Sequence, residues 1–227
     1  MTIRQILYSP QLVQLKCKVI AVISAAILTV LFGCSHTEKV LVPPKIDLKA
    51  YNAIGVIAFS SNAESELSEY ATQNFIQALQ SAQPGVRFLE IGSEKHVLAK
   101  ISREHLDLHA IQSIGSVYHV DALLFGHLTV SGPKPKVHLS STWKSMHAGA
   151  LVEASLITKL WETGSGVLLW TNSSRGKEPV ASLNADTSGN IDFGASDPKE
   201  SYGQLVPELV FINTVDFRSY YVYQKVK

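Results

Sequence analysis

The sequence predicts an α/β protein in which helices pack on a mixed β-sheet, ending in an antiparallel β-hairpin and a C-terminal helix. Residues 53–59 form a continuous apolar run, which is typical of a strand buried on both faces. The elements up to residue 130 follow in the order strand, helix, strand, helix, helix, strand. Two further strands, at 151–161 and 166–172, lie close together and precede a helix at 199–213. A mixed sheet covered by helices accommodates this order.

The first helix is expected over residues 64–80, where apolar side chains recur near helical spacing. Either Ser61 or Asn62 could cap its beginning, because short polar side chains accept hydrogen bonds from the first free backbone amides. Pro84-Gly85 ends it, and a second strand follows at 86–91.

Two shorter helices are expected next, at 93–101 and 107–118, and Ser93 is placed to cap the first of them. Residues 121–130 form a third apolar strand. The hairpin that follows turns at Glu162–Ser165, where Gly164 permits a positive φ.

Four segments lack a clear pattern. Residues 35–50 are interpreted as a short polar tether, 131–149 as a long basic loop, and 173–196 as an irregular polar excursion. The aromatic tail at 217–226 is ambiguous between strand and helix.

Charge and cysteine content exclude several functions. The formal net charge is +1, and no run of Lys and Arg alternates with aromatic residues, so nucleic-acid binding is not expected. Both cysteines, Cys17 and Cys34, precede the part that must fold. We therefore expect no disulfide in the folded domain.

The N-terminal segment has the layout of a signal peptide. Cationic residues precede an apolar run at 19–32, which has about 14 residues and is short for a permanent membrane span. The run ends in Leu31-Phe32-Gly33-Cys34, which resembles a bacterial lipobox. The resemblance implies cleavage before Cys34 and attachment of lipid, including palmitate, to its thiol; an uncleaved anchor or an ordinary signal peptide is the alternative.

The residue after the cysteine bears on which membrane holds the protein. In lipoproteins an Asp at this position favours retention at the inner membrane, so the resemblance makes Ser35 a signal for export to the outer membrane, facing the periplasm. The expected organisation is a signal peptide at 1–33, a lipidated cysteine with its tether at 34–50, and one periplasmic α/β domain at 51–227.

Three stretches resemble the periplasmic domains related to the amino-terminal domain of TolB and to the curli-secretion lipoprotein CsgG. Residues 53–59 (AIGVIAF) are similar to the opening strand of that family, 118–126 (YHVDALLFG) to its G-V-D-Y-V-L-x-G strand, and 156–170 (LITKLWETGSGVLLW) to its T-G hairpin. The resemblance implies relatives that act in curli secretion, in flagellar basal bodies, and as activators of penicillin-binding proteins.

Catalytic and metal chemistry find little support. His105 and His109 are four residues apart, which places both on one helix face if that segment is helical. A zinc site needs three or four ligands, and the sequence has no His-Glu-x-x-His motif and no pair of cysteines for the folded domain. The additional candidates for ligands are His96, Glu104 and His119. We expect no enzyme, no metal and no cofactor; a metal-dependent or hydrolytic enzyme is the alternative.

Protein recognition remains. Aromatic side chains next to cations suit interface hot spots, and two segments offer them: the basic loop and the aromatic tail. The candidate partner-binding residues are Trp143, Lys144, Met146, Tyr220, Tyr221 and Tyr223. The alternatives are that the loop is mobile and that the tyrosines complete the core.

The expected function is that of an outer-membrane lipoprotein that binds other envelope proteins as an assembly or accessory factor, anchored through its lipid and able to form a homo-oligomer. Two alternatives stay open: an oligomeric secretion component like CsgG, and an activator of a penicillin-binding protein. The second is less favoured, because a tether of about 15 residues reaches roughly 50 Å at full extension.

Overall fold

The computed structural model describes residues 37–63, 65–139, 145–186, 191–195 and 197–225. These belong to two units. The larger unit is Pro43–Ser219, and the described part of the smaller one consists of two strands, one from each end of the chain. Among the described helices, none combines the length and apolar composition that crossing a bilayer requires.

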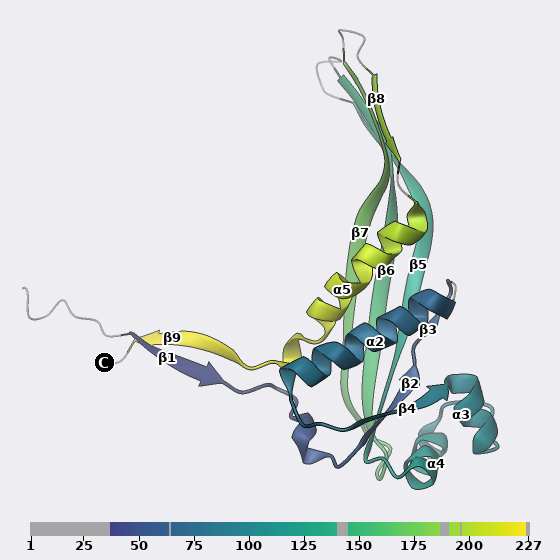
Figure 1. Cartoon of the computed structure of the whole chain (residues 1–227), viewed down its shortest axis with the longest axis vertical. Coiled ribbons are helices and arrows are strands. Elements are labelled where there is room, and N and C mark those ends of the chain that lie inside the picture. The colour runs from purple at the N-terminus through teal and green to yellow at the C-terminus, as the bar shows by residue number, and fades with distance from the viewer. Residues whose placement is uncertain (1–36, 64, 140–144, 187–190, 196, 226–227) are drawn as a thin grey trace, which may run out of the picture. The chain divides into compact units, whose positions relative to one another are not determined.

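The larger unit is built on a mixed sheet, drawn in Figure 1. Its strands are β2 (Ile54–Ala58), β3 (Ser60–Ser61), β4 (Phe88–Ser93), β5 (Ala122–Leu139), β6 (Ser145–Glu162), β7 (Leu168–Asp186) and β8 (Ile191–Ala195). The order is β4-β2-β5-β6-β7-β8, with β3 beside β5. The neighbours β4, β2 and β5 are parallel, whereas β5 to β8 are antiparallel.

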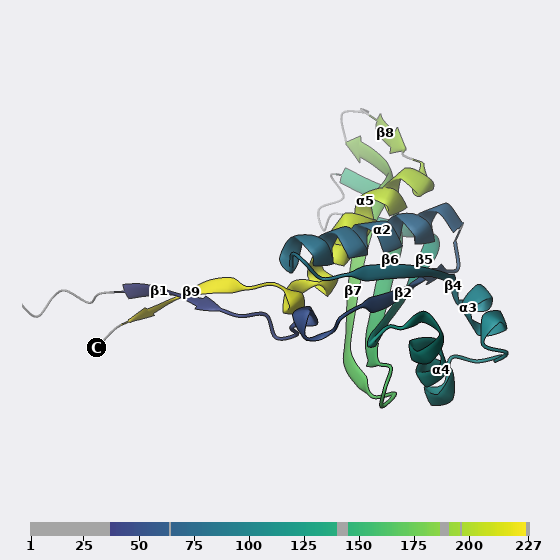
Figure 2. The ribbon, with the colours of Figure 1, turned by 60° about the horizontal axis from the view of Figure 1, so that its bottom comes forward.

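Helices cover the sheet unequally. The helices are α2 (Ser65–Ala82), α3 (Glu94–Lys100), α4 (Leu108–Tyr118) and α5 (Pro198–Asn213), with short 3₁₀ turns η1 (Leu48–Ala50) and η2 (Val215–Phe217). Figures 1 and 2 show α2 and α5 side by side over one face, with α3 and α4 on the other side near β2 and β4. The predicted fold class, a mixed sheet with helices packed on it, is confirmed.

The main core lies under α2 and α5. Strand β6 turns alternate side chains toward these helices, because successive side chains of a strand point to opposite faces, and Val152, Leu156 and Leu160 are buried there. Phe75 of α2 and Phe217 of η2 complete this core, and each such buried side chain contributes about 1.5–3 kcal/mol. A smaller cluster holds α3 and α4 to the opposite face.

Short polar side chains begin three of the helices. Ser93 accepts a hydrogen bond from the amide of His96 at 3.4 Å, which confirms the predicted cap of α3. Asp107 caps α4 and Asp197 caps α5 in the same way. These bonds satisfy backbone donors that the first turn of a helix leaves free.

Gln83 ties together the points where the chain enters and leaves the larger unit. Its side-chain oxygen accepts the amide of Leu48 at 2.7 Å. Its side-chain nitrogen donates to the carbonyls of Ile46 at 2.7 Å and Phe217 at 3.0 Å. Because Gln83 is buried, these bonds fix the two terminal segments to the end of α2.

Two predicted loops are wrong. The segment 131–149 is largely strand, since β5 continues to Leu139 and β6 begins at Ser145. The segment 173–196 contains the rest of β7 and all of β8. Pro133 and Pro135 favoured a loop in the sequence, but they lie at or just beyond a bulge in β5. Prolines are tolerated at bulges and on sheet edges.

The hairpin between β6 and β7 forms where the sequence predicts it, with Trp161 opposite Leu168. The glycine with positive φ, however, is Gly166 (φ 71°) and not Gly164. Thr163 donates to the carbonyl of Val120 at 2.6 Å, so the start of the turn is also tied to the loop that precedes β5.

The smaller unit is a two-stranded ribbon. Strand β1 (Thr37–Val42) pairs antiparallel with β9 (Tyr220–Lys225). Part of the segment interpreted as a short polar tether is therefore a strand, and most of the ambiguous tail is a strand as well.

Candidate functional site

Among the described residues, no helix covers the sheet face opposite α2 and α5 over β6 and β7. Side chains at alternate positions of β6 are buried under the helices, whereas those between them are partly or fully exposed, and Ile157 is 43% exposed. Strand β7 follows the same alternation in matching register. We call this surface the open face; its residues are Lys134, Glu153, Ser155, Ile157, Lys159, Thr171, Ser173, Arg175 and Lys177.

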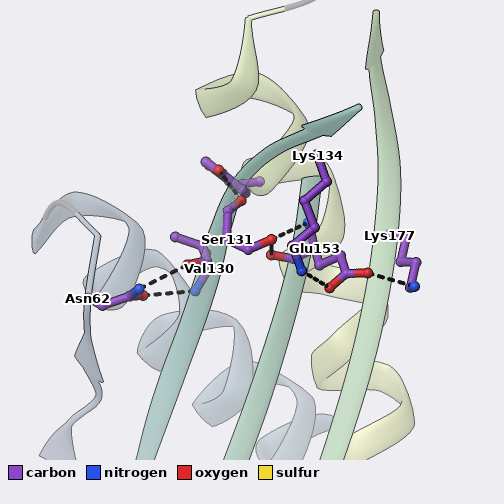
Figure 3. Close-up of polar contacts among 7 residues, drawn as sticks. Asn62, Val130, Ser131, Lys134, Glu153 and Lys177 are labelled. Atoms are coloured by element: carbon purple, nitrogen blue, oxygen red, sulfur yellow. Dashed lines mark hydrogen bonds and ion pairs between the residues drawn. The ribbon is translucent and has the colours of Figure 1, made fainter. Parts of the chain in front are cut away.

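Glu153 is the electrostatic centre of the open face. Its Oε2 lies 2.7 Å from the Nζ of Lys134, and its Oε1 lies 2.6 Å from the Nζ of Lys177. Figure 3 shows the carboxylate between these two cations. One side chain of β6 thus connects β5, β6 and β7 across the strands.

The two lysines change the acidity of this carboxyl group. Hydrogen bonds from Lys134 and then Lys177 lower the pKa of Glu153 to about 2. The group is therefore charged at every physiological pH, and about a quarter of the side chain remains exposed to a binding partner.

Polar side chains also fix the backbone next to Glu153. The side-chain amide of Asn62 bonds the backbone of Val130 as a neighbouring strand would. Its Nδ2 donates to the carbonyl of Val130 at 2.9 Å, and its Oδ1 accepts the backbone amide of Val130 at 2.8 Å. Tyr202 of α5 donates to the carbonyl of Ser131 at 2.7 Å, and the Ser131 hydroxyl accepts the amide of Glu153 at 3.3 Å. Figure 3 shows Asn62 beside Val130, and Ser131 close to Lys134 and Glu153.

The bulge in β5 determines on which face of the sheet the Lys134 side chain lies. The register shifts between Ser131 and Lys134, so strict alternation does not predict the face of the lysine. Its contact with Glu153 shows that it lies on the open face.

The charge on the open face is predominantly positive. Among its described residues the only anion is Glu153, against the cations Lys134, Lys159, Arg175 and Lys177. Such a surface favours an anionic partner and disfavours a cationic one.

The described residues that were predicted to bind a partner belong to two different units. Tyr220, Tyr221 and Tyr223 lie in β9, exposed by 52%, 56% and 73%, so they do not complete the core. Met146 lies in β6, a strand of the larger unit, opposite Leu139 of β5. Cys34, Ser35, Trp143 and Lys144 lie outside the described residues.

The histidines do not share a helix face in the predicted way. Helix α4 begins at Leu108, so His105 precedes it and only His109 belongs to it. Within the ranges that the structure describes, no three His, Cys, Asp or Glu side chains are placed to hold a metal ion.

A polar hollow of about 640 Å³ lies near the β6–β7 turn. Its acidic groups are occupied in holding the fold: Asp121 accepts the amide of Asn52 at 2.7 Å, and Glu162 accepts a hydrogen bond from Ser165. Burial and then the charge of Glu162 raise the pKa of Tyr51 at its edge. Because these acidic groups hold the fold around the turn, we assign the hollow a structural role.

Sequence reasoning missed the open face, although a signal was present. Residues 152–156 alternate apolar and polar side chains, which is the pattern of a strand with one solvated face. The ion pairs were not predictable, because they join residues 19 and 24 positions apart through the strand register.

No known family model matches the chain, and no curated protein matches it. Similar solved structures include the lipoprotein GNA1162 from Neisseria meningitidis, with 15% identity, 70% of this chain and 96% of that chain covered, and a TM-score of 0.38. The PelC dodecamer from Paraburkholderia phytofirmans has 10% identity, coverages of 81% and 98%, and a TM-score of 0.39. The C-terminal domain of LpoB from Escherichia coli has 9% identity, coverages of 56% and 83%, and a TM-score of 0.32. Likenesses this distant identify no family.

Proposed function

We propose that this chain is a lipid-anchored protein of the bacterial cell envelope that acts by binding another envelope protein through the open face. The lipid is attached to Cys34, and Ser35 directs the protein to the outer membrane, where it faces the periplasm. The observation that carries the binding role is a bare sheet face whose central charges are already held in place.

The arrangement of the open face supports binding to a protein. Small-molecule sites are concave, whereas this face is one side of a sheet. Ile157 supplies an apolar contact next to the cations Lys159 and Arg175, which combines the two properties that interface hot spots need.

The fixed positions of side chains on the open face favour affinity for a partner. Binding costs about 0.5–1.5 kcal/mol for each flexible side chain that becomes immobile. Lys134 and Lys177 are already held by Glu153, so part of this cost is met in the free protein. We therefore propose an acidic segment of the partner, which the remaining cations attract.

A photo-crosslinking amino acid tests this proposal in cells. Placed at Ser173, which is exposed on the open face, it should give a discrete adduct with an envelope protein. The same amino acid at Glu208, which is exposed on α5, is the matched control and should give no such adduct.

Charge reversal sharpens the experiment. Arg175→Glu combined with Lys177→Glu should abolish the Ser173 adduct while the protein still folds and reaches the membrane. Equal adducts from Ser173 and Glu208, or an adduct that survives charge reversal, would contradict the proposal.

A second candidate function is self-association, and a single observation supports it. The outer sides of α2 and α5 expose Glu66, Glu69, Glu200 and Glu208, which are opposite in charge to the open face. Head-to-tail contacts between two different surfaces produce rings or filaments. In that case Ser173 and Glu208 would both give an adduct with the mass of two copies of this chain, and sedimentation would show salt-dependent oligomers.

A further inference from the structure

The ribbon of β1 and β9 exposes apolar and aromatic side chains along its whole length. Its register pairs Lys39 with Tyr223 and Leu41 with Tyr221, which places these four residues on one face. Leu41 is 53% exposed, Tyr221 56% and Tyr223 73%. We call this surface the ribbon face.

A ribbon of two strands needs support from outside. Isolated two-stranded hairpins are marginally stable in water, and stable sheets have a third strand or a packed face. Among the described residues of the smaller unit there is neither a third strand nor a helix. A surface that covers the exposed side chains would therefore stabilise these two strands.

The start of β1 indicates what that is. Thr37 is the third residue after Cys34, and three residues span at most about 10 Å. Residues 37–42 are paired in the ribbon and are therefore not a free tether. A lipid on Cys34 would hold β1 at the membrane surface; this step rests on the proposed lipid anchor.

The chemistry of the ribbon face suits that location. Tyrosine places an apolar ring in the lipid and a polar hydroxyl in water, and lysine extends its charge toward the headgroups. The Nζ of Lys39 lies 4.2 Å from the centre of the Tyr221 ring, so a cation accompanies the aromatic surface. Lys225 adds a second cation, which an anionic membrane attracts.

We propose that the ribbon face, formed by Lys39, Leu41, Tyr221 and Tyr223, lies in the headgroup layer of an anionic phospholipid membrane. It is a second membrane contact beside the lipid on Cys34. The open face is then free for the protein partner.

Vesicle binding tests the ribbon face independently of the lipid. The mature chain from Ser35 onward is produced without lipid and sedimented with vesicles of phosphatidylethanolamine and phosphatidylglycerol in a ratio of about 3:1. We expect it to cosediment, and Leu41→Ser with Tyr223→Ser should weaken its binding by about tenfold or more.

Two exposed apolar residues of the larger unit provide the matched control. Val167→Ser with Phe211→Ser removes similar exposed apolar surface and should leave vesicle binding unchanged. Thermal unfolding followed by circular dichroism verifies that the larger unit of each variant is folded.

Lipid contact can also be detected directly. The new indole of Tyr223→Trp, in the lipidated protein, should be quenched by lipids brominated on the acyl chain near the headgroup. Absence of both quenching and cosedimentation would overturn the proposal. So would a crosslinker at Tyr221 that captures a protein strand instead of lipid. Neither outcome affects the lipid anchor, which fractionation of Cys34→Ala tests separately.

Discussion

At the scale of single residues, the most informative charge is Glu153. A carboxylate on a solvated sheet face is ordinarily of little consequence, because exposed ion pairs contribute little to stability. Here one carboxylate holds a lysine from each neighbouring strand, so its value lies in ordering the surface. The candidate site is therefore a property of three strands and not of one loop.

The pH dependence of Glu153 follows from its lowered pKa. The folded-state pKa is about 2, against an ordinary value of 4.5. The contribution of the ion pairs to stability is fully present above pH 4.5 and is lost as the pH falls from 4.5 toward 2. An NMR titration of the Glu153 carboxyl carbon should have its midpoint near 2.

Glu153→Gln checks the same prediction thermodynamically. The variant should be less stable than the parent at neutral pH, and the difference should shrink as the pH falls through this window. Glu208→Gln on α5 is the control. A difference between parent and Glu153→Gln that is constant from pH 7 to pH 2 would show that the ion pairs are not formed.

Asn213 is the residue on which the docking of α5 depends most. It is fully buried, donates to the carbonyl of Leu156 at 2.9 Å, and accepts a hydrogen bond from Thr158. Asn213→Ala leaves these buried groups without partners and should lower the free energy of unfolding by about 1–3 kcal/mol in urea titrations. Gln80→Ala, at an exposed position of α2, should change it by less than about 0.5 kcal/mol.

At the scale of elements, close packing of α4 on the hairpin turn positions the end of the sheet. Gly115 faces Thr163, and a Cβ on Gly115 would lie 2.4 Å from the Cβ of Thr163. Thr163 cannot retreat easily, because its hydroxyl bonds the carbonyl of Val120. The glycine is thus required by the approach of helix to turn.

Two glycine substitutions in helices should have opposite effects. Gly115→Ala forces α4 away from the turn and should destabilise the protein by about 1–3 kcal/mol. Gly203→Ala in α5 meets nothing within 4 Å and should stabilise it by about 0.5–1 kcal/mol, since alanine restricts the unfolded chain. Equal effects of the two substitutions in urea unfolding would contradict this packing.

At the scale of the whole molecule, the proposed function depends on how the protein is held at the membrane. The proposed arrangement has three parts: a lipid at Cys34, the ribbon face on the membrane, and the open face toward a partner. The ribbon and the open face belong to different units, so each can be altered without the other.

Removing the lipidated cysteine should change where the protein is found in cell fractions. Cys34→Ala should move most of the protein from the membrane to the soluble fraction, because a single weak contact does not anchor a protein permanently. Fractionation followed by immunoblotting measures this, with Cys17→Ala as the control that should remain on the membrane. A Cys34→Ala protein that still fractionates entirely with membranes would refute lipid anchoring at this residue.

Elements with strong local signals were predictable from sequence. The apolar strand that becomes β2, the cap Ser93 and the turn after Glu162 depend on neighbouring residues alone. The strands β1, β8 and β9 and the extensions of β5 to β7 were not identified, because their residues are polar, proline-containing or ambiguous. Pairing with a distant strand, and not local preference, makes them strands.

The sequence by itself therefore determined the fold class, most element positions within the main core and the expectation of a lipidated Cys34. Only the tertiary structure placed Lys134, Glu153 and Lys177 together and joined the two ends of the chain in a ribbon. The physical reason is the range of the interactions. Helix caps and turns act within a few residues, whereas strand register, a bulge and ion pairs across strands join residues that only folding brings together.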